Sequence, residues 1–133
     1  MDSTEQDSDQ PGSGSAAIAA VGYLPLLFLV PLLGAREDEF ARFHGRQGLA
    51  LFLVFVGAWL AIWVVDLLFG RVLGHVILLG FLFRMVAWLV HNVVGTLLSL
   101  AYIAAMLVGV VQAAQGRWWR LPFVGAYAER FGL

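Results

Sequence analysis

EFARFHGRQGLALF, residues 39–52, joins a charged amphipathic turn directly to a run of apolar residues. On a helix through this stretch, Phe40 and Phe43 lie on a face opposite the charged residues. The charged part therefore suits the headgroup region of a membrane, with the phenylalanines inserted, and the apolar part suits its interior. We expect the chain to turn into the membrane near Gly45 and Gly48.

The composition indicates that the bilayer is the solvent of this chain. Hydrophobic residues make up 61% of the 133 residues and the mean hydropathy is +0.85, whereas soluble domains are about 45–50% apolar. The absence of cysteine excludes disulfides and cysteine-ligated metal centres. The predicted fold class is an all-α integral membrane protein.

Charge is distributed unevenly along the chain. Residues 1–15 carry four acidic and no basic residues, and this composition predicts a disordered acidic tail. The remainder carries eight arginines against five acids, a charge of +3, which suits anionic membrane lipids as partners. The arginines are scattered among apolar runs and no recognition motif is present, so nucleic acid is not an expected partner.

Residues 16–133 are predicted to form a single helical membrane domain with four hydrophobic segments. The first contains twenty uncharged residues, which would span about 30 Å as a helix, with kinks at Pro25 and Pro31. Between the last two segments, only His91 and Asn92 offer an evident turn. The hydrophobic segments are 16–35, 48–69, 72–90 and 93–114, and the interfacial segments are 36–47 and 117–133.

The chain could cross the membrane three or four times, depending on whether residues 72–90 span it. If this segment is re-entrant or tilted, three spans cross, and six arginines share one side against Arg71 and Arg84 opposite. Because positive loops stay in the cytoplasm, charge favours this reading. Hydrophobic length favours four spans, since nineteen residues suffice to cross and one arginine costs only about 2.5–3.5 kcal/mol.

Several polar and aromatic residues are candidate functional positions. His44 and Gln47 lie one turn apart beside Phe40 and Phe43, where they could bond a backbone carbonyl or the C-terminal RWWRLP loop as a structural clasp. Phe40, Phe43 and Pro122, which stops the helix in that region, are candidate members of the same clasp. The candidate lipid or interface residues are Arg36, Arg42, Arg46, Arg117, Trp118, Trp119 and Arg120, because tryptophan between arginines is typical of an interfacial anchor.

Inside the apolar slab, Asp66 and Arg84 are the candidate polar positions. Either they pair, or they reach the interface by position or snorkelling. A stripe of small residues at i,i+4 spacing predicts a helix-packing face, formed by Ala101, Ala105, Gly109 and Ala113.

Further predictions concern segments near the interfaces. Arg42 is spaced to pair with Asp38 or Glu39. Tyr127 and Phe131 suggest a short amphipathic helix on the surface.

The sequence carries no signature of a metal site, a cofactor or an enzyme. The histidines lack metal-ligand spacing. No cofactor motif, phosphate loop or nucleophile elbow appears, so an enzyme is not expected.

Three local patterns carry a family resemblance: GYLPLLFLVPLLG from Gly22, EFARFHGRQGLALF from Glu39, and GRWWRLPFVGAYA from Gly116. Together they resemble small bacterial membrane proteins related to the chloroplast inner-envelope import component of the Tic complex, a group that includes MamF-type magnetosome proteins. The resemblance covers nearly everything after Ser15 and implies a four-helix membrane subunit. It carries over to His44, Gln47, Gly116, Pro122 and Gly125, whereas Arg84 departs from it.

These observations favour a non-enzymatic scaffold or accessory subunit in a bacterial or archaeal cytoplasmic membrane. Its small-residue stripe would pack against a second copy or another membrane protein. Two alternatives stay open. One is a small channel or transporter-like pore, lined by Arg84, Asp66, Thr96, Ser99 and Gln112. The other is an anionic-lipid-binding protein that uses the arginine cluster.

Overall fold

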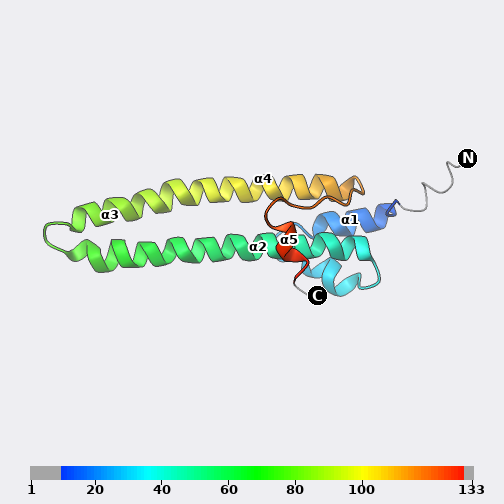
Figure 1. Cartoon of the computed structure of the whole chain (residues 1–133), viewed down its shortest axis with the longest axis horizontal. Coiled ribbons are helices and arrows are strands. Elements are labelled where there is room, and N and C mark those ends of the chain that lie inside the picture. Colours follow the sequence, from blue (N-terminus) through cyan, green and yellow to red (C-terminus); the bar gives the residue numbers. More distant parts are fainter. Residues whose placement is uncertain (1–9, 131–133) are drawn as a thin grey trace, which may run out of the picture. The chain divides into compact units, whose positions relative to one another are not determined.

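The computed structural model describes residues 10–130, and this part of the chain contains helices and no strand (Figure 1). Most of the predicted acidic tail, as well as Phe131, lies outside the described residues. The elements are α1 (Ser13–Val21), η1 (Val30–Gly34), α2 (Glu39–Val65), η2 (Asp66–Val72), η3 (Leu73–His75), α3 (Gly80–Leu89), η4 (Val90–Val94), α4 (Gly95–Ala114) and α5 (Gly125–Ala128). Of these, η1, η2 and η4 are π-helical and η3 is a 3₁₀ turn.

The chain forms two compact units. The first combines Met1–Phe52 with Ala104–Leu133, and the second is Leu53–Ile103. The long helices α2 and α4 each have one end in the first unit and the other end in the second. The first unit therefore brings the N-terminal elements together with the C-terminal segment, and the second is a helical hairpin.

The predicted first span is not one bent helix. α1 has nine residues, about 13 Å of helix, and turns occupy the chain from Gly22 until just before η1. Pro25 cannot donate a helical hydrogen bond, and Leu26 has a left-handed backbone with φ of 65°. These two residues end the helix well before it could cross a bilayer.

α2 begins at a side-chain cap and runs without a turn through the predicted interfacial segment. The backbone N–H of Ala41 donates to the Asp38 carboxylate at 3.0 Å, which satisfies one of the free amides of the first turn. The expected turn at Gly45 and Gly48 is wrong, since both lie inside one 27-residue helix. Arg42 pairs with neither acid in the described part of the chain; it donates to the Arg36 carbonyl at 3.3 Å.

The expected turn at His91 and Asn92 is also wrong. Both residues lie in η4, which joins α3 to α4 in a continuous helical run, and the Asn92 amide donates to the Trp88 carbonyl within it. The chain reverses instead between η3 and α3. A Cβ on Gly80 would lie 2.4 Å from the Gly74 carbonyl oxygen, so these glycines permit the close approach that this reversal needs.

Two helical runs are long and apolar enough to cross a membrane: Glu39–His75, with 37 residues, and Gly80–Ala114, with 35. In their most apolar windows only 22% and 11% of the residues are buried. A core helix of a soluble protein would be mostly buried, so these exposed apolar surfaces suit lipid. Among the described residues, the structure has two such helices where the sequence suggested three or four crossings.

Candidate functional site

The most completely bonded polar group of the first unit is the imidazole of His44, which is fully buried. Its Nε2 lies 3.0 Å from the Arg117 carbonyl oxygen and its Nδ1 lies 2.9 Å from the Tyr23 hydroxyl. Because a carbonyl can only accept, Nε2 donates, and Nδ1 of the neutral ring then accepts from the hydroxyl. His44 thus links α2 to the chain on both sides of it in sequence.

Gln47, one turn further along α2, bonds the same C-terminal segment with both ends of its amide. Its nitrogen donates to the Trp119 carbonyl at 3.0 Å, and its oxygen accepts from the Leu121 backbone N–H at 2.6 Å. The Gln47 amide therefore satisfies one backbone carbonyl and one backbone N–H of the C-terminal segment, as a neighbouring strand would in a sheet. Gln47 is 1% exposed and Leu121 is 4% exposed.

Aromatic rings enclose the imidazole. The rings of Phe40 and Phe43 lie 4.7 and 5.1 Å from it, centroid to centroid, in edge-to-face geometry. Trp118 covers the same two phenylalanines at 5.1 and 5.2 Å. Such pairs add to the burial energy and hold water away from the polar contacts. We call Tyr23, His44, Gln47 and the backbone of residues 117–121 the clasp.

Glycines bring the backbones close enough for the clasp to form. A Cβ on Gly48 would lie 1.8 Å from the Gly22 carbonyl oxygen, and one on Gly45 would lie 2.9 Å from the Pro31 ring. On α4, a Cβ on Gly109 would lie 2.4 Å from the Tyr23 ring. Small residues on α2 and α4 therefore pack against the N-terminal segment.

Part of the small-residue stripe is thus an intramolecular surface. Gly109 and Ala113 are buried within the first unit, whereas Ala101 is exposed and Ala105 is half-buried. The predicted packing against a partner is restricted to the end of the stripe that bears Ala101.

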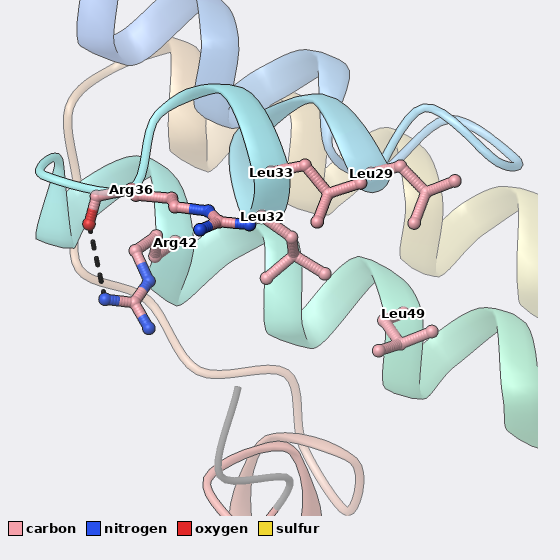
Figure 2. A pocket seen from close by; sticks show the side chains of 6 residues that line it. All are labelled: Leu29, Leu32, Leu33, Arg36, Arg42 and Leu49. Atoms are coloured by element: carbon pink, nitrogen blue, oxygen red, sulfur yellow. Dashed lines mark hydrogen bonds between the residues drawn. The ribbon is translucent and has the colours of Figure 1, made fainter.

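The arginines of the predicted interface cluster separate into different surroundings. Arg36 and Arg42 line a hollow with four leucines (Figure 2). Arg42 also lines a second hollow with Glu39, Phe43, Arg46 and Trp118. Arg120 pairs with Glu129 at 2.8 Å.

The remaining C-terminal positions contribute backbone or surface. Arg117 and Trp119 offer their carbonyls to the clasp. Pro122 is exposed, immediately after the last clasp residue.

In the second unit, the predicted polar pair has different partners. The Asp66 carboxylate lies 3.1 Å from His91 Nδ1. Arg84 donates through Nε and Nη2 to the Gly74 carbonyl, at 3.1 and 2.8 Å, across the reversal of the hairpin. Asp66 and Arg84 do not pair.

The other residues of the predicted pore are hydrogen-bonded within their own helix or belong to different units. The Ser99 hydroxyl donates to the Gly95 carbonyl of its own helix. Gln112 belongs to the first unit and Thr96 to the second. Residues 10–130 contain no cluster of three or more histidine and carboxylate side chains that could hold a metal ion.

Sequence reasoning missed two members of these contacts. Tyr23 is absent from the candidate positions above, although a tyrosine within an apolar run needs a partner for its hydroxyl. His91 has two expected roles, in a turn or as a metal ligand, and neither pairs it with Asp66. Its signal was its position in an apolar stretch, where an ionisable group needs a partner.

Comparison with known proteins identifies the family. Residues 13–128 match the model of the magnetosome magnetite crystal formation protein family, MamF/MmsF. The chain is 31% identical to magnetosome protein MamF of Paramagnetospirillum magneticum over 92% of this chain and 90% of the relative. It is 32% identical to magnetosome protein MmsF of the same bacterium, over 90% of each.

A second MamF, from Magnetospirillum gryphiswaldense, is 31% identical over 83% of this chain and 78% of the relative. No solved structure matches the chain. These relatives support the magnetosome part of the resemblance and give no support to the part concerning the import component. The chain belongs to the magnetosome magnetite crystal formation protein family.

Proposed function

We propose that this chain is a non-enzymatic accessory protein of the magnetosome membrane that contributes to magnetite crystal formation. The family and the names of its relatives support the process and the location. Two long apolar helices support residence in the membrane.

The observation that carries the non-enzymatic role is the clasp. Its three polar side chains bond each other or the backbone of residues 117–121. Groups committed in this way stabilise a fold and are poorly placed to exchange protons with a substrate. The clasp instead fixes the C-terminal segment to α2, which would present a defined surface to a partner.

The test is complementation in a magnetite-forming bacterium whose own MamF and MmsF relatives have been deleted. The wild-type chain should shift the crystal size distribution, measured by electron microscopy, towards that of the undeleted strain. Gln47→Leu should restore less, whereas Gln115→Leu, at an exposed glutamine outside the clasp, should match the wild type. If the wild-type chain reaches the magnetosome, followed as a fluorescent fusion, and leaves crystal size unchanged, the proposed function is wrong.

For the partner, we propose a second copy or another membrane protein at the exposed end of the small-residue stripe. Cysteine at Ala101 should crosslink in the membrane, whereas cysteine at Ala113, which is 0% exposed, should not. Equal crosslinking at both positions, or at neither, would contradict this surface.

The channel alternative has less support, because Asp66 and Arg84 are each bonded to other groups. Solute flux into liposomes, lost on Arg84→Leu, would favour it over the accessory role.

A further inference from the structure

A hollow in the first unit combines apolar walls with two guanidinium groups. Its volume is about 400 Å³, within the range of about 300–1,000 Å³ that is usual for ligand sites. Among the described residues, no carboxylate lines it. Its lining consists of four leucines and two arginines: Leu29, Leu32, Leu33, Leu49, Arg36 and Arg42. In Figure 2 the two arginines lie at one end of the hollow, the Arg36 side chain running towards Leu32 and Leu33 and the Arg42 guanidinium turned to the Arg36 carbonyl, with Leu29 and Leu49 farther along.

The positive charge at the arginine end is available to a ligand. Arg42 donates one bond, from Nη1 to the Arg36 carbonyl, which leaves its other N–H groups for further acceptors. The Arg36 side chain is exposed, and its guanidinium has no hydrogen-bond or ion-pair partner in residues 10–130. Two carboxylates lie nearby: Asp38 is engaged at the start of α2, and Glu39 lines the neighbouring hollow with Arg42 without an ion pair to it in the described part of the chain.

Arg42 and Leu49 follow each other along α2 in the order in which a lipid presents its charged head and its apolar tail. Leu49 follows Arg42 by seven residues, about 10 Å along a helix axis. Arg42 belongs to the charged start of α2, and Leu49 belongs to the apolar run that suits the hydrocarbon. A ligand held at both ends needs an anionic head and an apolar tail about one nanometre away from it.

We propose that this hollow, defined by its four leucines and two arginines, is a binding site for one anionic phospholipid. The phosphate accepts hydrogen bonds from Arg36 and Arg42, and part of an acyl chain lies along the leucines. Guanidinium groups suit phosphate because they offer several donors in one plane. The inference requires only that the chain resides in a membrane, and it is independent of any role in crystal formation.

The test is native mass spectrometry of the full-length protein in detergent, titrated with phosphatidylglycerol or with phosphatidylcholine of the same acyl chains. The wild type should retain phosphatidylglycerol preferentially. The double variant Arg36→Gln, Arg42→Gln should bind it about 30-fold more weakly, since each arginine near an anionic surface contributes roughly fivefold. Arg71→Gln, which removes an exposed arginine of the second unit, is the matched control and should bind as the wild type does.

A second variant tests the acyl part without changing charge. Leu33 is 60% exposed, so Leu33→Trp is compatible with folding and should reduce binding by filling the hollow. Leu97→Trp, at a residue 61% exposed in the second unit, is its control. Circular dichroism of each variant verifies that it is folded.

Three results would overturn the proposal. They are equal retention of the two lipids, equal loss in the arginine variants and their control, and displacement of phosphatidylglycerol by millimolar inorganic phosphate alone. The last would mean that only a phosphate group is recognised. None of these measurements depends on crystal size, so failure here leaves the proposed function standing.

Discussion

At the scale of single residues, Gln47 is the side chain whose loss should cost most, because both ends of its buried amide bond backbone groups, the Leu121 N–H in a buried contact and the Trp119 carbonyl in a partly buried one. Gln47→Leu should lower the midpoint of thermal unfolding in detergent, since it leaves the Trp119 carbonyl and the Leu121 N–H without partners. Each unsatisfied group costs about 1–3 kcal/mol. Gln115→Leu is the control, and equal midpoints for the two variants would show that the clasp does not stabilise the fold.

Two glycines provide a second test at this scale. Gly109→Ala would place a Cβ 2.4 Å from the Tyr23 ring, whereas a Cβ on Gly57 meets nothing within 4 Å. Gly57→Ala should therefore be neutral or stabilise by roughly 0.5–1 kcal/mol through helix propensity. Gly109→Ala should destabilise, because Tyr23 must move away from His44.

The measurement for both glycine variants is the unfolding midpoint in the same detergent. Similar midpoints would indicate that Tyr23 is not held against α4.

At the scale of elements, the hairpin of the second unit depends on a side chain that closes its reversal. Arg84 on α3 donates two hydrogen bonds to the Gly74 carbonyl at the start of that reversal. The residues between the helices, Val76–Leu79, are all exposed and apolar, so they contribute little packing of their own. The arginine is therefore the main polar contact that we expect to hold the reversal closed.

Arg84→Gln should increase hydrogen exchange at the amides of Val76 and Gly80, which bond within the reversal. We expect the exchange rate to rise roughly tenfold, the effect of losing about 1.4 kcal/mol of local stability. Arg71→Gln should leave these rates unchanged. Unchanged rates in the Arg84 variant would mean that the glycines alone determine the reversal.

At the scale of the whole molecule, the two long helical runs predict two crossings. The α1 helix is too short to cross, so the N-terminal segment and the C-terminus should share one side of the membrane. That side would carry six arginines, against Arg71 and Arg84 on the other. The positive-inside rule then places both ends in the cytoplasm.

Labelling of single cysteines with an impermeant reagent checks this topology. Cysteines at Ser13 and Ala126 should react from the cytoplasmic side only, and a cysteine at Ile77, which is 98% exposed, from the opposite side. Reaction of the Ser13 and Ala126 positions from opposite sides would support three crossings and contradict the two-helix topology.

The sequence by itself determined the helical class and the suitability of the chain for a lipid environment. Both follow from local quantities, namely the lengths of apolar runs and the positions of charges. It also singled out His44 and Gln47, because polar groups at the start of an apolar helix need partners in protein.

The sequence offered the RWWRLP loop as one candidate partner of these two side chains; the tertiary structure decided which of its backbone atoms they bond, added Tyr23, and decided where the chain turns. The bonds of His44 and Gln47 to residues 117–121 join positions more than 70 residues apart, a separation for which no local pattern exists. The reversal between η3 and α3 was likewise decided by the fold, because it needs the close approach of Gly74 and Gly80, which hydropathy does not predict. Hydropathy reflects the free energy of transferring each side chain between water and lipid. The close approach of two backbones depends instead on which surfaces the fold brings together.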